Sequence, residues 1–267
     1  CNDIKKTSFS SIPYLMIEVL ILSLIQGITE FLPVSSSSHL IIFSNFINFD
    51  SRSLSIDISL HIGSFLAVIT FFYKDILDFI KNKNLFLKIV VSSLPVIFVG
   101  FLLVETGLIQ ELRNIKVIGW MTLIFGVKLY ISDKFNVLNN IRDNFNYKNA
   151  IFIGLFQVFS LIPGVSRSGI TITAARFLKF KRFDAAKISF LLSIPTLGAV
   201  SIFGLKNIFT SENLDFSILN YISILFSFVI SFLTIKFFLN FVKKFSMTVF
   251  VVYRIVLGII ILIFAYL

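Results

Sequence analysis

Long apolar blocks separated by short polar loops dominate the hydropathy pattern of this 267-residue chain. Six blocks have the length of a membrane-spanning helix: 56–72, 86–104, 117–132, 185–205, 218–239 and 249–267. Continuous apolar runs of this kind are typical of transmembrane helices, because the hydrocarbon core is ~30 Å thick and a helix rises ~1.5 Å per residue. The pattern therefore predicts an all-α integral membrane protein.

A further segment near the start has two apolar arms around a polar interruption. Residues 12–25 lead into a polar motif, 26–39, and the apolar arm that follows, 40–47, is very short. Eight helical residues rise only ~12 Å, far less than the bilayer core. This favours a re-entrant hairpin at about 12–47 with the motif at its tip, buried in protein or beside a wet cavity. An ordinary spanning helix followed by a surface loop is the alternative.

The same kind of segment recurs in the second half of the chain. A shift of 131 residues aligns Gln26 with Gln157, Thr29 with Ser160, Val34 with Val165, Ser35 with Ser166 and Ser37 with Ser168. Apolar arms flank this second motif on both sides, so a second hairpin is predicted at 150–178. Each half, 1–132 and 150–267, then holds a hairpin and three crossings, joined by a polar linker at 133–149. An odd number of crossings predicts two inverted-topology repeats.

Basic residues are distributed unevenly over the two predicted sides of the membrane. Of the 24 lysines and arginines, six fall on the side of the N-terminus and sixteen on the other, with Arg167 and Arg254 inside the membrane. The positive-inside rule then places the basic loops in the cytoplasm and both termini outside. In a chain that is 57% hydrophobic, this rule explains the net charge of +10 without a nucleic-acid partner. The single cysteine excludes an internal disulfide and a cysteine metal cluster.

Glu30 is the most informative single residue of the first motif. A carboxylate beside Phe31 and Leu32 is expensive in a membrane and rarely lies there without a task. We interpret it as a general base or as a ligand of magnesium or calcium, since hard cations prefer carboxylate oxygens. A solvated carboxylate at the membrane interface is the alternative. Gln26 lies four residues earlier on the same helix face and is expected to steady Glu30 or to complete a metal shell.

Four serines and a histidine follow Glu30. Ser35, Ser36, Ser37 and Ser38 could form no more than a polar turn and a helix N-cap. His39, however, lies three residues after Ser36 and therefore on the same helix face, which is the geometry that a base needs to take a hydroxyl proton. We interpret Ser36 as the candidate nucleophile, with Ser35 next, and His39 as its base.

The second motif, 163–169, has the composition of an anion site. Its proline and glycine break the helix and the next helix begins at its serines, so free backbone N–H groups point into the break. Arg167 adds a bidentate fork that suits phosphate. An ion pair with Glu30 for structure alone is the alternative for Arg167, and a ligand could displace that pair. Thr171 either contributes a hydroxyl group or is an ordinary helix residue.

Three isolated features carry weaker predictions. Arg254 stands in an apolar block, where it is expected to pair with a buried acid or to contact substrate. Asp57 and His61 lie four residues apart and are interpreted as an interfacial pair. Pro195 is expected to kink its helix.

Together the two motifs resemble the signatures of a known family. Gln-x-x-x-Glu-Phe-Leu-Pro-Val-Ser-Ser, with His39 close behind, and Pro-Gly-x-Ser-Arg-Ser-Gly are similar to the paired motifs of bacterial undecaprenyl-diphosphate phosphatases, the family also linked to bacitracin resistance. Further likenesses lie at 63–68, at 189–195 and at the pair Tyr253-Arg254. The resemblance covers essentially the whole chain in order.

The resemblance implies an enzyme of the bacterial inner membrane with two inverted repeats. Such an enzyme removes the terminal phosphate of undecaprenyl diphosphate and so recycles the lipid carrier of cell-wall synthesis. It also implies a divalent cation, magnesium or calcium, and an active site reached from outside. This chain departs from the family pattern at Gln26, where many members have a second glutamate, and at Ser38, where glycine is usual.

By position, the resemblance and the residue chemistry predict one site. The catalytic residues are Glu30, Ser36, His39 and Arg167; the substrate-binding residues are Gln26, Ser35, Ser37, Gly164, Ser166, Ser168 and Thr171; and the metal ligands are Glu30 and Gln26. Either Ser36 attacks the terminal phosphorus with His39 as base, or His39 attacks directly.

The expected partners are a polyprenyl diphosphate and membrane lipids, while a homodimer is left open. A lipid carrier or flippase is the alternative function, because inverted repeats with broken helices that meet near the midplane are also used by transporters. Release of phosphate would separate the two. A purely structural scaffold would not explain an acid and an arginine inside the membrane.

Overall fold

The computed structural model describes residues 12–36, 38–40, 53–81, 83–210 and 216–267. These residues form helices and contain no strand, only an isolated bridge between Asn139 and Phe180. In chain order the elements are α1 (Ile12–Thr29), α3 (Leu54–Phe71), α4 (Tyr73–Lys81), α5 (Lys83–Glu105), α6 (Leu108–Glu111), α7 (Ile115–Asp133), α8 (Ile141–Asn144), α9 (Tyr147–Val158), the 3-10 helix η1 (Phe159–Leu161), α10 (Arg167–Phe177), α11 (Arg182–Thr210), α12 (Ile218–Lys244) and α13 (Thr248–Tyr266).

Six of these helices, α3, α5, α7, α11, α12 and α13, are long and apolar enough to cross a membrane, which confirms the six predicted crossings. Most predicted boundaries shift outward. Helix α12, for example, was predicted to end at 239 and continues to Lys244. Lysines at a helix end can lay their aliphatic chain on apolar surface and keep their ammonium group in water. Pro195 lies inside α11, and the kink expected there stays a prediction.

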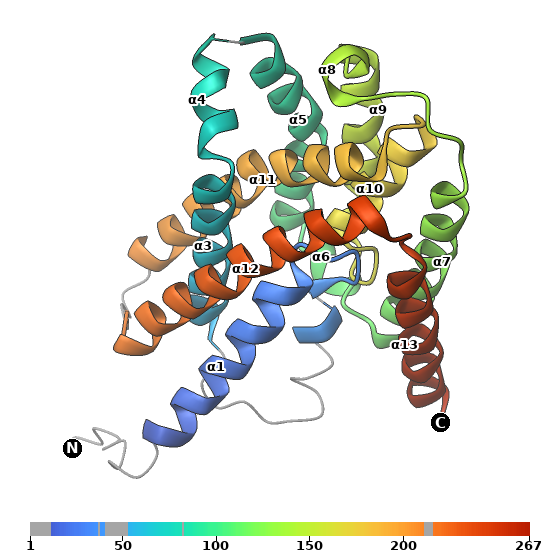
Figure 1. Ribbon diagram of the computed structural model, residues 1–267. Coiled ribbons are helices and arrows are strands. Elements are labelled where there is room, and N and C mark those ends of the chain that lie inside the picture. Colours follow the sequence, from blue (N-terminus) through green and yellow to red (C-terminus); the bar gives the residue numbers. More distant parts are fainter. Residues whose placement is uncertain (1–11, 37, 41–52, 82, 211–215) are drawn as a thin grey trace, which may run out of the picture.

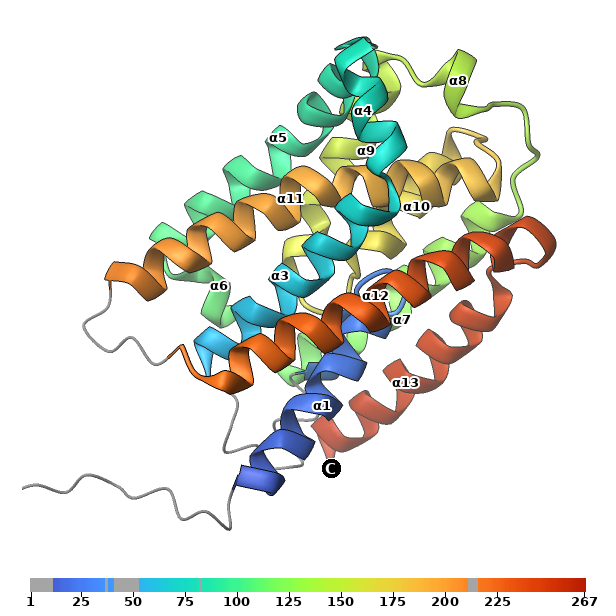
Figure 2. The ribbon, with the colours of Figure 1, turned by 60° about the vertical axis from the view of Figure 1, so that its left-hand side comes forward.

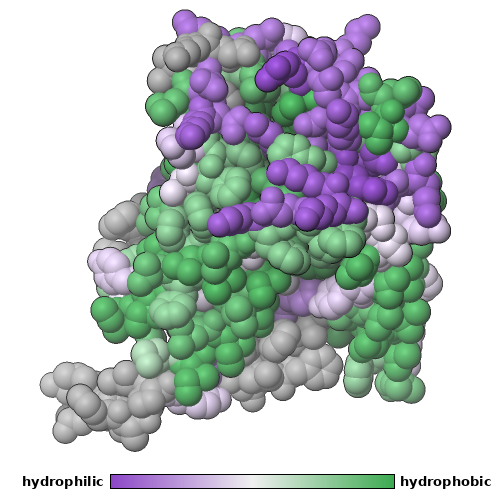
Figure 3. All heavy atoms as spheres, viewed as in Figure 1, coloured by the Kyte–Doolittle hydropathy of each residue, from purple (hydrophilic) through white to green (hydrophobic). Residues whose placement is uncertain are grey.

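The outer surface matches a lipid environment. Large apolar side chains are exposed along α5 and α13; Phe98 is 64% exposed and Phe264 58%. Apolar residues cover most of the face seen in Figure 3, and hydrophilic residues gather at the end of the molecule where α4 and α8 lie. Leu267 lies at the opposite end (Figure 1). The chain is therefore a multi-pass membrane protein.

Helix contacts cross between the two halves of the chain. Helix α12 packs against α1 and α3, α5 packs against α9 and α11, and α13 runs along α7 (Figures 1 and 2). Small and hydroxylated residues permit the close approach of α3 and α12: the Ser227 hydroxyl donates to the Leu60 carbonyl at 2.7 Å, and the Ser64 and Ser231 hydroxyls lie 2.9 Å apart. In a membrane the lipid is as apolar as the helix surfaces, so the hydrophobic effect does not drive helices together. Close packing and hydrogen bonds of this kind stabilise the helix pair instead.

The second interrupted segment consists of two short helices on either side of a break. Helix α9 has 12 residues, the backbone breaks between η1 and Arg167, and α10 has 11 residues. The Lys181 amide donates to the Asn139 carbonyl at 3.1 Å, so the chain before α8 and the chain after α10 lie side by side.

In the first segment, α1 ends at Thr29 and helical backbone resumes at Ser36. The predicted return arm beyond Leu40 lies outside the described residues. The sequence analysis missed the four-residue helices α6 and α8 and also α4, which is amphipathic and only nine residues long, too short for a crossing. Helix α4 is tied to α11 by an ion pair between Asp75 and Lys187 at 2.6 Å.

Candidate active site

The two broken segments meet inside the bundle. The Ser168 hydroxyl, at the start of α10, donates to the carbonyl of Leu32 at 2.7 Å. One residue earlier, Arg167 Nη2 donates to Glu30 Oε1 at 2.9 Å. Beside Glu30, the fully buried ring of Phe31 packs edge-on against Phe190 of α11, with ring centroids 5.3 Å apart. Residues more than 130 positions apart are thereby held in one place.

Each tip contains a serine with a backbone conformation that L-residues rarely adopt. Ser35 has a φ of 78° and Ser166, its counterpart under the 131-residue shift, has a φ of 70°. Such conformations cost of order 1–3 kcal/mol and persist only where the surroundings hold them. The Ser166 hydroxyl accepts from the Gly169 amide at 3.1 Å and caps α10.

Gly164 is required by both conformation and space. Its φ is +99°, and an added Cβ would lie 2.6 Å from the Ile118 carbonyl of α7. A larger side chain would push the second tip away from α7, so this glycine fixes the position of the tip.

Glu30 is the centre of the polar contacts at the tips. Its side chain is only 7% exposed, and both of its oxygens accept hydrogen bonds. Oε1 accepts from Arg167; Oε2 accepts from the Ser36 hydroxyl at 2.8 Å and from Gln26 Nε2 at 3.0 Å. The acid, the predicted nucleophile, the predicted metal ligand and the arginine therefore form one connected group.

Both ring nitrogens of His39 contact residues other than Ser36. Its Nδ1 lies 2.6 Å from the Ser35 carbonyl, and because a carbonyl can only accept, Nδ1 carries the proton in the neutral ring. Nε2 then accepts from the Tyr253 hydroxyl at 2.5 Å, and the two rings stack with centroids 5.7 Å apart. The predicted shared face of Ser36 and His39 is thus replaced by separate contacts: Ser36 donates to Glu30.

Two buried polar atoms at the site have no hydrogen-bond partner among the described residues. They are Gln26 Oε1 and Arg167 Nη1. A buried group without a partner is costly unless a ligand or water satisfies it. One is an acceptor suited to a cation, the other a donor suited to an anion, and both lie beside Glu30.

The residues partly fit a divalent cation. Among the described residues no three His, Cys, Asp or Glu side chains come together as a metal cluster. Magnesium, however, is often bound by one or two carboxylates that are completed by water and substrate phosphates. Glu30 and the free Gln26 Oε1 suit such a shared site, whereas they would not hold a cation alone.

The remaining predicted residues have different surroundings. The Thr171 hydroxyl lies 2.8 Å from the Arg167 carbonyl and 2.7 Å from the Ser189 hydroxyl, so it links α10 to α11. The Ser35 and Ser38 hydroxyls lie 2.9 Å apart. Ser37 is outside the described residues.

Three residues take part that the sequence did not assign to the site. His61 Nδ1 lies 3.1 Å from Gln26 Nε2, and the expected pair of His61 with Asp57 stays a prediction. Tyr253 meets His39, as described above. The sequence signals were the position of each residue in an apolar helix and, for Tyr253, the likeness of the pair Tyr253-Arg254 to the family pattern.

Arg254 pairs with no acid among the described residues. Fully buried in α13, it donates to four backbone carbonyls: Pro33 (3.2 Å), Val165 (3.0 Å), Gly164 (2.8 Å) and Thr122 (3.2 Å). The first three belong to the two broken tips, whose carbonyls have lost helical partners. Arg254 therefore clamps the tips together rather than balancing an acid.

Comparison with known proteins is consistent with this arrangement. Residues 19–260 match the family model described as bacitracin resistance protein BacA. An undecaprenyl-diphosphatase of Pelagibacter ubique (strain HTCC1062) is 48% identical over 252 residues, covering 94% of this chain and 98% of that protein. The undecaprenyl-diphosphatase of Jannaschia sp. (strain CCS1) is 38% identical over 260 residues, covering 92% and 97%. That of Ruegeria sp. (strain TM1040) is 35% identical over 265 residues, covering 94% and 99%.

Proposed function

The chain belongs to the bacitracin resistance protein BacA family, and we propose that it hydrolyses undecaprenyl diphosphate to undecaprenyl phosphate and inorganic phosphate. The observation that carries the proposal is the group formed by Glu30, Ser36 and Arg167 where the two broken helices meet. It combines a hydroxyl group, an acceptor for its proton and a cation for the phosphate within hydrogen-bonding distance.

Arg167 and the start of α10 would bind the diphosphate. The unpartnered Nη1 of Arg167 offers a buried donor, and the helix N-terminus adds backbone N–H groups and a favourable dipole. Ser166 and Ser168 lie on the same turn. The substrate would displace the Arg167–Glu30 pair, so that the guanidinium exchanges a carboxylate for phosphate oxygens.

Ser36 would attack the terminal phosphorus. A bond forms between its Oγ and phosphorus, the bond to the bridging oxygen breaks, and undecaprenyl phosphate leaves. Glu30 is the group placed to take the Ser36 proton, since that hydroxyl already donates to it. Water then cleaves the phosphoserine and releases phosphate. Direct attack by His39 is the competing route; it requires Nε2 to part from Tyr253 first.

We assign the predicted magnesium or calcium ion to Glu30 and Gln26, together with oxygens of the substrate. The unpartnered Gln26 Oε1 supports this assignment. Such an ion would supply neutralising charge for the diphosphate and for the charge that develops in phosphoryl transfer.

We further propose that the halves 1–132 and 150–267 are inverted repeats, each with a re-entrant hairpin. Two observations support this: the reciprocal packing of α12 on α1 and of α5 on α9, and the return of the chain from Asn139 to Phe180. Both termini would lie outside the inner membrane and the basic loops, including 133–149, in the cytoplasm. A homodimer stays a prediction. The carrier alternative is not favoured, since the relatives are named diphosphatases.

The proposal is tested by phosphate release from undecaprenyl diphosphate with the purified chain in detergent. We expect release that stops on chelation of divalent cations and returns with magnesium or calcium. Glu30→Gln, which keeps the shape but not the charge, should abolish it. Binding of the lipid without release by well-folded wild-type protein would instead favour a carrier.

A further inference from the structure

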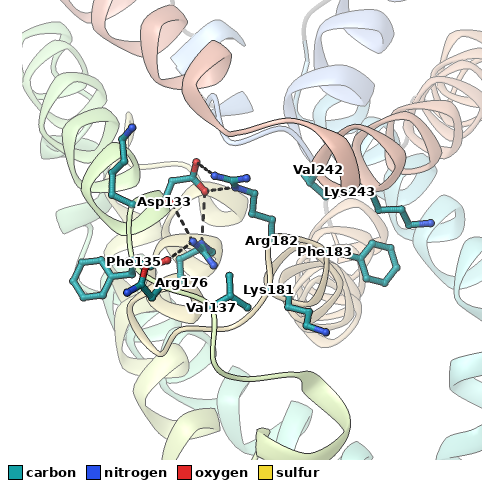
Figure 4. A pocket seen from close by; sticks show the side chains of 11 residues that line it. Asp133, Phe135, Val137, Arg176, Lys181, Arg182, Phe183, Val242 and Lys243 are labelled. Atoms are coloured by element: carbon teal, nitrogen blue, oxygen red, sulfur yellow. Dashed lines mark hydrogen bonds and ion pairs between the residues drawn. The ribbon is translucent and has the colours of Figure 1, made fainter.

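A second polar pocket lies away from the tips, at the end of the molecule that carries α4 and α8. Its volume is about 560 Å³ (Figure 4). It is lined by Asp133, Lys134, Phe135, Asn136, Val137, Arg176, Lys181, Arg182, Phe183, Val242 and Lys243. None of these residues belongs to the group around Glu30 and Arg167.

Asp133 and two arginines form the frame of this pocket. Arg182 donates to both oxygens of Asp133, at 2.7 and 3.0 Å, and the Met247 amide donates to Oδ2 at 3.1 Å. The buried Arg176 donates to the carbonyls of Asp133 and Phe135, as Figure 4 shows. These charges are therefore engaged in holding the wall in place.

Three further cations lie on the pocket wall, and among the described residues only Lys181 has a carboxylate outside the lining, that of Asp184, close enough to interact with its charge. Lys134, Lys181 and Lys243 are exposed, and Asp133 is the only acidic residue among the lining residues. Lys134 lies over the Tyr130 ring at 5.0 Å and Lys243 over the Phe183 ring at 4.8 Å, contacts that leave ammonium donors available. The pocket therefore has a preformed excess of positive charge.

The position of the pocket indicates the kind of anion. It lies where α7 ends, α11 begins and α12 ends, which is the boundary of three membrane-spanning helices. Its walls also carry the apolar side chains of Val137, Phe183 and Val242. A soluble anion would need only the charges, whereas a lipid headgroup would use both the charges and the apolar wall.

We propose that this pocket binds the phosphodiester headgroup of an anionic membrane phospholipid. The lysines of the pocket wall, Lys134, Lys181 and Lys243, attract the phosphate, and the glycerol and first acyl carbons lie against Val137 and Phe183. The proposal goes beyond the phosphatase function and does not depend on it, since the two sites share no residue.

Native mass spectrometry of the delipidated full-length chain tests the proposal. Phosphatidylglycerol and phosphatidylcholine of equal chain length are titrated into wild type, into Lys181→Gln/Lys243→Gln, and into the matched control Lys236→Gln/Lys244→Gln. The control removes the same charge from exposed positions outside the pocket. Because one lysine near an anionic headgroup contributes about a fivefold gain in affinity, the pocket variant should bind phosphatidylglycerol at least about tenfold more weakly. The control should match wild type.

Three results would overturn the proposal: equal affinity of the pocket variant and wild type, an equal loss in the control, or displacement of phosphatidylglycerol by millimolar inorganic phosphate. Repeating the titration with Arg167→Ala excludes binding at the tips, since that variant should keep the phosphatidylglycerol preference. Phosphate release by the pocket variant should equal that of wild type, so failure here and failure of the phosphatase proposal are separate outcomes.

Discussion

The two broken segments have the same backbone device and different chemistry. Ser35 and Ser166 both have a positive φ, and each precedes the helix that follows the break. The first tip carries an acid, a hydroxyl and an imidazole; the second carries a guanidinium. In the proposed function, the two tips share this helix break, and the first is the reactive half while the second is the anion-binding half.

The aligned glutamines show what this divergence changed. Gln26 Nε2 contacts Glu30 and His61. The counterpart Gln157 is fully buried, yet neither of its amide atoms has a hydrogen-bond partner among the described residues. The position equivalent to Glu30 in the second half is Leu161, which offers no polar atom. Gln157 therefore has the amide group of Gln26 without an acidic partner four residues later.

The largest effect is expected at the guanidinium. Arg167→Ala should lower phosphate release by ~10³-fold or more, because the arginine stabilises charge that develops in phosphoryl transfer. Arg167→Lys keeps the charge without the fork and should be intermediate. Phosphate release is measured beside circular dichroism of each variant; full activity in folded Arg167→Ala protein would refute the assignment of the anion site.

Substitutions of the two aligned glutamines should have different effects in the two halves of the chain. Gln26→Leu is expected to reduce activity by ~10–100-fold and to raise the magnesium concentration needed for half-maximal rate, as loss of an outer metal contact does. Gln157→Leu removes an unsatisfied buried amide, which costs ~1–3 kcal/mol, so it should raise the midpoint of thermal unfolding by a few degrees. If Gln26→Leu and Gln157→Leu lowered activity to a similar extent, the proposed division into a reactive first tip and an anion-binding second tip would be contradicted.

The positive-φ serines should respond alike. Ser35→Gly and Ser166→Gly should change the free energy of unfolding by less than ~1 kcal/mol, because glycine tolerates this conformation and replaces an N-cap cheaply. Ser35→Val and Ser166→Val should lower it by ~2 kcal/mol or more, since β-branched residues are strained there. Thermal unfolding in detergent compares the four. A valine variant as stable as its glycine partner would mean that the backbone relaxes at that tip.

Some features of the fold and of the candidate site could be predicted from the sequence, and others could not. The six crossings could be predicted because lipid imposes long apolar runs, and α4 was missed because nine amphipathic residues give no such signal. The Glu30–Arg167 pair was foreseen as an alternative, since two buried opposite charges favour each other. The Arg254 clamp and the contact of His39 with Tyr253 were not predicted, because neither joins opposite charges: the clamp uses backbone carbonyls, and the contact joins a hydroxyl and an imidazole.

Phosphate release by Ser36→Ala, beside Ser38→Ala as a matched control, tests the central claim most directly. We expect Ser36→Ala to bind undecaprenyl diphosphate with near wild-type affinity, through Arg167, but to release almost no phosphate. Ser38→Ala, whose hydroxyl contacts Ser35 rather than Glu30, should keep most of the activity. Wild-type release by Ser36→Ala would contradict attack by this hydroxyl and move the reaction to His39.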